Sequence, residues 1–150
     1  MAGFKGKYEH AVDDKGRFSF PSKLRKSLSP EANDSFVITR GYENSLAMYP
    51  LDAWIRFEDK MKAELNTHRK EDRRFIRYIM MWAQEVTLDK QSRIMIPQEL
   101  MKFAGIAGHV VVLGSLETIE LWSPENFQEY SEFNGETSPE DIGARVMGNA

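Results

Sequence analysis

The sequence contains no cysteine. This absence excludes disulfide bonds, thiol nucleophiles and thiolate metal sites. No apolar run approaches the ~20 residues that a membrane-spanning helix requires, and the first ten residues lack the apolar core of a signal peptide. With 150 residues, 41% of them hydrophobic and 29% charged, the chain has the composition of a soluble globular domain. We therefore expect a cytoplasmic protein without a membrane partner.

Signals of catalysis are also scarce. The three histidines, His10, His68 and His109, lie far apart and show no metal-ligand spacing. The chain has no glycine-rich phosphate loop and no GxSxG nucleophile motif. We expect no enzyme activity, no cofactor, no bound metal and no small-molecule substrate.

Charge is distributed unevenly along the chain. The net charge is −3, but residues 1–82 hold 16 basic against 12 acidic side chains, whereas residues 83–150 hold 4 against 11. A local field, and not the net charge, attracts a polyanion. The basic first half is therefore compatible with a nucleic-acid partner despite the acidic total.

Two stretches of the chain occur twice. "VDDKGRFSFPSKLRKSL" (residues 12–28) aligns with "LDKQSRIMIPQELMKFA" (residues 88–104). Further on, "FVITRGYENSLAMYPLDAW" aligns with "HVVVLGSLETIELWSPENF", which matches Gly41 with Gly114. Agreement of two blocks in the same order indicates an internal duplication.

Each copy predicts a strand, a tight turn, a second strand, a short helix, a β-hairpin and a closing helix. One copy is too small to form a stable core alone, so we expect an α+β fold in which two β-rich halves pack with pseudo-twofold symmetry. The spacing of Phe75, Tyr78, Ile79 and Trp82 predicts an amphipathic helix inserted between the copies. The predicted divisions are repeat 1 at 7–54, linking helices at 55–82, repeat 2 at 83–127 and an acidic tail at 128–150 that is mobile or packs on a neighbour.

Both copies contain an Asp-x-x-x-Arg turn, Asp13 to Arg17 and Asp89 to Arg93. In a structural interpretation, the aspartate caps its own turn and pairs with the arginine. In a functional one, the two guanidinium groups bind phosphate oxygens or the O6 and N7 atoms of guanine. The candidate anion-binding residues are Asp13, Lys15, Gly16, Arg17, Asp89 and Arg93, with Lys5 and Lys7 on the preceding strand.

The two turns differ in their neighbours. The first is followed by Lys23, Arg25 and Lys26, whereas the second is followed by Glu99 and Lys102. This difference favours the first turn as the stronger anion site. Where the first turn has Gly16, the second has Ser92, so the second turn either has another shape or bears strain of about 1 kcal/mol or more.

The segments "FKGKYEHAVDDKGRFSFPSKLR", "LAMYPLDAW", "RFIRYIMMWAQEVTLDKQSRIMIPQEL" and "VVLGSLETIELWSPENF" together resemble the bacterial MraZ family up to about Tyr130. The resemblance implies two SpoVT/AbrB-like half-barrel repeats assembled into a ring-shaped homo-oligomer. It also implies a nucleoid-associated transcriptional regulator, usually a repressor, at short direct repeats in the promoter of the division and cell-wall gene cluster.

In that family the DxxxR motif contacts DNA, a role that the resemblance carries onto Asp13, Arg17, Asp89 and Arg93. Ser92 departs from the usual glycine, which puts the DNA role of the second turn in question. The alternative function is a non-enzymatic oligomeric scaffold in which both turns are structural.

Overall fold

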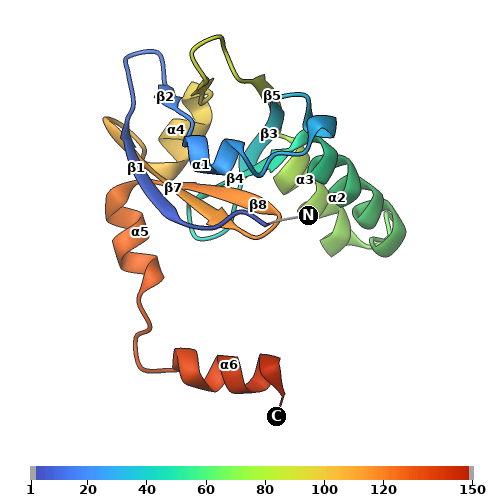
Figure 1. Cartoon of the computed structure of the whole chain (residues 1–150). Helices are drawn as coiled ribbons and strands as arrows, with labels where there is room; N and C mark the ends of the chain where they lie inside the picture. Colours follow the sequence, from blue (N-terminus) through green and yellow to red (C-terminus); the bar gives the residue numbers. More distant parts are fainter. Residues whose placement is uncertain (1–2, 149–150) are drawn as a thin grey trace.

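The computed structural model describes residues 3–148 and contains two copies of one series of elements (Figure 1). The first copy comprises β1 (Lys7–Ala11), β2 (Arg17–Ser19), α1 (Ser22–Arg25), the 3-10 helix η1 (Pro30–Ala32), β3 (Ser35–Arg40), β4 (Leu46–Pro50) and α2 (Leu51–Glu64). After α3 (Lys70–Met80), the second comprises β5 (Gln84–Thr87), β6 (Arg93–Met95), α4 (Gln98–Ala104), β7 (His109–Ser115), β8 (Thr118–Trp122) and α5 (Pro124–Ser131). The chain continues into α6 (Pro139–Met147). The predicted order of elements and the α+β class are confirmed.

The two copies exchange strands. A six-stranded sheet has the order β1-β7-β8-β4-β3-β5, and β2 pairs with β6 in a separate two-stranded ribbon. All pairs are antiparallel. The first strand of each copy thus pairs with the hairpin of the other, so neither half completes its own sheet. The pseudo-twofold axis passes between β4 and β8 and between β2 and β6.

The main core lies where the two copies meet. Phe18 and Ile94 pair across β2–β6 and are almost fully buried, and Leu46 and Leu121 pair across β4–β8 with no exposed surface. Each completely buried apolar side chain of this size contributes roughly 1.5–3 kcal/mol to folding. The core that holds the copies together therefore lies directly beneath the β2–β6 ribbon.

The strand registers correct one part of the repeat alignment. Arg40 pairs with Leu46, and Gly114 pairs with Ile119. Because Leu46 and Ile119 are counterparts about the pseudo-twofold axis, Gly114 corresponds to Arg40. The expected match with Gly41 is wrong because the loop between β3 and β4 is longer than the turn between β7 and β8.

The helix expected between the copies lies elsewhere. Ile79 of α3 packs with Val37 of β3 and Trp54 of α2 in a second apolar cluster, separate from the main core. Strand alternation explains this location, because Val37 points to the face opposite Phe36 and Ile38. The helices α2 and α3 form a hairpin on the outer face of β3, on the side of the molecule away from α5 (Figure 1).

Across residues 3–148, no helix has both the length and the apolar character needed to cross a membrane.

Candidate functional site

The first Asp-x-x-x-Arg turn connects β1 to β2 and is closed by its own aspartate. Asp13 Oδ1 accepts hydrogen bonds from the backbone N–H groups of Lys15 at 3.0 Å and Arg17 at 2.8 Å. Asp13 Oδ2 accepts one from Arg17 Nε at 2.8 Å. The turn is further closed by backbone bonds between Asp13 and Arg17 and from Gly16 to Asp13. One carboxylate thus orders both the loop and the guanidinium group.

The second turn, between β5 and β6, repeats this geometry. Asp89 Oδ1 accepts from the N–H groups of Gln91 at 2.8 Å and Arg93 at 2.9 Å, and Asp89 Oδ2 accepts from Arg93 Nε at 2.8 Å. Ser92 reaches the same shape with φ 60°, compared with φ 83° at Gly16. A φ of 60° lies within the small left-handed region open to side-chain-bearing residues. The expected alternative that the second turn has another shape is therefore wrong, because Ser92 takes the positive φ that Gly16 has in the first turn.

The hydrogen bonds perturb both aspartates in the same direction. The hydrogen bond from the backbone N–H of Arg17 is the largest influence and lowers the pKa of Asp13. Desolvation is the second and raises it, and the Arg17 side chain and the Lys15 N–H lower it further. The N–H of Arg93 leads the same set of causes at Asp89, whose pKa is also lowered. Both carboxylates are therefore ionised at neutral pH and can hold the arginines in place.

Each arginine keeps donors available for a ligand. Arg17 and Arg93 use Nε to bind their aspartates, and their terminal Nη1 and Nη2 atoms have no hydrogen-bond partner within residues 3–148. The two side chains are 31% and 30% exposed. A guanidinium fixed through Nε and open at its outer edge is oriented for two parallel hydrogen bonds to an anion.

Pairing of β2 with β6 brings the turns together. Arg17 lies opposite Met95, and Arg93 lies opposite Ser19. Because Phe18 and Ile94 point into the core, all four of these residues share the outer face of the ribbon, where Met95 is 53% exposed. The diagonal arrangement places the Cα atoms of Arg17 and Arg93 roughly 7–8 Å apart. Both turns project from the same end of the molecule, away from α6 (Figure 1).

Each turn packs against the short helix of the other copy. A Cβ on Gly16 would lie 2.9 Å from Met101 Sδ of α4. At the second turn, Arg25 of α1 donates a hydrogen bond from Nη1 to Ser92 Oγ and pairs through Nη2 with Asp34 Oδ2 at 3.3 Å. The basic helix α1 therefore flanks the second turn, although it follows the first in the chain.

This crossing removes the charge argument for a stronger first turn. Lys15 shares a surface hollow with Glu85 and Glu99 of the second copy, while Arg25 reaches the second turn. The second turn also carries Lys90 at the position that Asp14 occupies in the first. Lys90 was missed by the sequence interpretation although the alignment contains it; the placement of Arg25 had no signal in the sequence.

Lys5 and Lys7 are not brought to the turns. Lys7 is the first residue of β1 and Lys5 precedes the strand, whereas the turn follows its other end. Lys7 Nζ lies 5.5 Å from the centre of the Phe127 ring of α5. A Cβ on Gly114 would lie 2.3 Å from the backbone nitrogen of Lys5, so this segment passes directly against β7. Lys15 and Gly16, by contrast, lie within the first turn.

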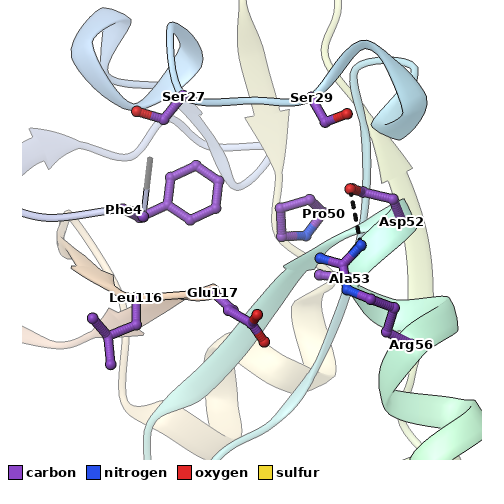
Figure 2. Close-up of a pocket in the computed structure, with 10 residues that line it drawn as sticks. Phe4, Ser27, Ser29, Pro50, Asp52, Ala53, Arg56, Leu116 and Glu117 are labelled. Atoms are coloured by element: carbon purple, nitrogen blue, oxygen red, sulfur yellow. Dashed lines mark hydrogen bonds and ion pairs between the residues drawn. The ribbon is translucent and has the colours of Figure 1, made fainter. Parts of the chain in front are cut away.

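A small hollow of about 110 Å³ near the start of the chain is the other polar candidate (Figure 2). Asp52 pairs through Oδ2 with Arg56 Nη1 at 3.4 Å, while its buried Oδ1 has no partner among the described residues. Ser27 and Ser29 line the same hollow. No histidine or lysine lines it to activate a serine, and residues 3–148 contain no cluster of three or more His, Asp or Glu side chains that could hold a metal ion. This hollow therefore offers less chemistry than the two turns.

Fold and site together define a class: a duplicated α+β protein that presents two matched guanidinium groups on one β-ribbon, an arrangement suited to binding anions. The family model described as "MraZ protein, putative antitoxin-like" matches the chain twice, over residues 4–78 and 79–149. The chain belongs to the MraZ family.

Relatives support this membership over most of the chain. A protein of Clostridium beijerinckii is 45% identical and one of Clostridium tetani is 41% identical, each over 87% of this chain and 89% of the relative. A protein of Leuconostoc citreum is 40% identical over 85% of this chain and 86% of the relative. All three are named transcriptional regulator MraZ.

Proposed function

We propose that this chain is a DNA-binding transcriptional regulator whose Asp-x-x-x-Arg turns contact promoter DNA. The observation that carries the proposal is the paired geometry: each aspartate holds its arginine through Nε and leaves Nη1 and Nη2 open. The relatives' names support the regulatory class. Direct contact with base edges would give sequence discrimination, whereas contact with phosphate would give affinity alone.

The proposal includes both turns, through Asp13, Arg17, Asp89 and Arg93, with Lys15 and Gly16 in the first and Lys90 in the second. Their common face on the β2–β6 ribbon lets neighbouring phosphates or bases be contacted at once. One pair of arginines gives weak, salt-sensitive binding. We propose that a ring-shaped homo-oligomer presents many such pairs to short direct repeats, which raises the effective concentration of each further contact.

The resemblance stated above extends the proposal to the target. The regulator would act in the nucleoid, as a repressor of the division and cell-wall gene cluster. Footprinting on the region upstream of the protein's own operon tests this part, since protection of regularly spaced short repeats is the expected pattern.

The test of DNA contact is Arg17→Ala, measured on promoter repeats and on random DNA. Loss of a bidentate guanine contact of about 1–3 kcal/mol weakens specific binding roughly 5- to 150-fold and random binding less. Lys60→Ala is the matched control, because Lys60 lies on α2 and, within residues 3–148, its ion-pair partner is Glu64 at 3.9 Å. Unchanged affinity of Arg17→Ala would contradict the proposal.

The scaffold alternative has one observation in its favour, namely that each aspartate already uses its arginine within the turn. It predicts that the wild-type protein does not bind DNA and that Arg17→Ala alters the molar mass of the assembly in light scattering. Intact assembly with lost DNA binding supports the regulator.

A further inference from the structure

The last helix of the chain is not packed into the body formed by the other described residues. Figure 1 shows α6 lying apart from the sheet and from the other helices, and no residue of α6 is buried. Ser138 caps its first turn by accepting a hydrogen bond from the N–H of Asp141 at 3.1 Å. Nine residues are nonetheless fewer than the ~12–15 that an isolated helix needs in water. Helix α6 therefore depends on contacts that one chain does not supply.

The sequence of α6 is amphipathic. Ile142 and Val146 lie four residues apart on one face, and Val146 is 68% exposed. Glu140 and Asp141 lie on the other face. Such a helix is stable when its apolar stripe is laid in an apolar groove with a polar rim.

The α2–α3 hairpin contains a groove of this kind. Apolar side chains line a hollow of about 280 Å³ on the surface of the hairpin, with Glu58, Lys62 and Thr67 beside them. They are Met61 of α2, Leu65 directly after α2, and Ile76 and Met80 of α3. Met80 remains 40% exposed there. Exposed methionines adapt to the shape of an inserted apolar side chain.

The charged side chains around the groove indicate which kind of segment binds there. Lys62 and Glu58 both line it, and Arg73 and Arg77 lie on α3 close to Ile76 and Met80 along the helix surface, so these basic side chains outnumber the one carboxylate of the lining. The segment that ends in α6 is acidic, and its carboxylates are Glu132, Glu136, Glu140 and Asp141. Opposite charges around an apolar contact favour and orient the encounter.

We propose that α6 of one copy docks in the α2–α3 groove of a second copy. In Figure 1, α5 and α6 extend from the side of β1 and β7, whereas α2 and α3 cover the side of β3. The helix and the groove are thus different surfaces on different sides of the molecule. A repeated contact between unlike surfaces is head-to-tail, and it forms a ring when the rotation closes. This contact would join the subunits of the oligomer in the proposed function, on which the inference rests. It can be detected in the absence of DNA.

The absence of native cysteine makes the test direct. We expect a chain carrying both Met80→Cys and Val146→Cys to form, on oxidation, a ladder of dimers and larger species on a non-reducing gel. A bond formed only within single chains, or no bond at all, would overturn the proposal. The matched control combines Ile55→Cys with Val146→Cys, since Ile55 is 50% exposed on α2 but lies outside the groove. An equal ladder from the control would also overturn it.

A second measurement separates this contact from DNA recognition. Val146→Asp changes an exposed residue, so the fold of each chain is expected to survive while the molar mass in light scattering falls. The dispersed protein should still bind a single promoter repeat weakly and lose that binding with Arg17→Ala. An unchanged molar mass argues against the α6 contact, whereas lost sensitivity to Arg17→Ala argues against the proposed function alone.

Discussion

The two Asp-x-x-x-Arg turns have nearly the same hydrogen bonds but different surroundings. The bonds from Nε to Oδ2 are 2.8 Å in both. Gly16 is packed under Met101 of α4, whereas Ser92 is held by Arg25 of α1. The hydrogen bonds within the turn are therefore the same in both copies, whereas the side chain that the neighbouring helix places against the turn differs. The helix beside the second turn supplies Arg25, which is paired with Asp34, and the second turn itself has Lys90 where the first has Asp14.

The largest expected effect comes from removing both guanidinium groups. Arg17→Ala combined with Arg93→Ala should weaken specific DNA binding by about 30-fold or more, since each contact contributes about 1–3 kcal/mol. If the turns act equally, the two single variants lose similar affinity in an equilibrium binding assay. A loss confined to Arg17→Ala would restore the first turn as the main site.

Gly16→Ala tests the packing difference. The new Cβ would lie 2.8 Å from the Ile96 carbonyl oxygen and 2.9 Å from Met101 Sδ, at φ 83°. We expect the free energy of unfolding to fall by about 1–3 kcal/mol in urea titrations. Ser92→Ala, which keeps a Cβ that the second turn already accommodates, should cost about 1 kcal/mol or less. Equal losses would show that the two turns are packed alike.

Arg25→Met gives the second turn the kind of side chain that Met101 provides at the first. Stability should fall by about 1 kcal/mol or less, because the pair with Asp34 is solvent-exposed. If Arg25 also contacts phosphate, the slope of log affinity against log salt falls by about one. Lys23→Met is the control, because it removes a charge from the same helix and leaves the contact with Ser92 in place. If both variants change the salt dependence equally, the effect of Arg25 comes from its charge and not from its position.

Acid should weaken both turns equally and only modestly. Folding lowers the pKa of Asp13 and Asp89 below the ordinary 3.8, so their stabilisation is complete above that value and is lost as the pH falls through the lower folded pKa. Urea unfolding at neutral pH and below pH 3.8 should show the difference between wild type and Asp13→Asn shrinking in acid. Asp89→Asn should behave the same way, and a difference between the two variants would indicate unequal turns.

Much of the fold could be predicted from periodicity. Phe18 and Ile94 alternate with exposed neighbours as half-buried strands do, and the duplication predicted that two halves pack with pseudo-twofold symmetry. The pairing of β2 with β6 was not part of that prediction. The position of α3 could not be predicted, because an amphipathic stripe does not say which apolar surface it covers. The alignment of Gly114 failed for a related reason: a loop can change length by one residue without leaving a mark in the flanking strands.

The sequence by itself determined the duplication, the order of the elements, the closure of each turn by its aspartate and the membership of the MraZ family. These follow from contacts between residues close in the chain or from the repeat itself. Only the tertiary structure decided which helix flanks which turn, because antiparallel pairing of β2 with β6 carries α1 to Ser92 and α4 to Gly16. Because the strands exchange between the copies, the helix that follows one turn in the sequence lies beside the other turn. Its charged side chains therefore belong to the surroundings of that other turn.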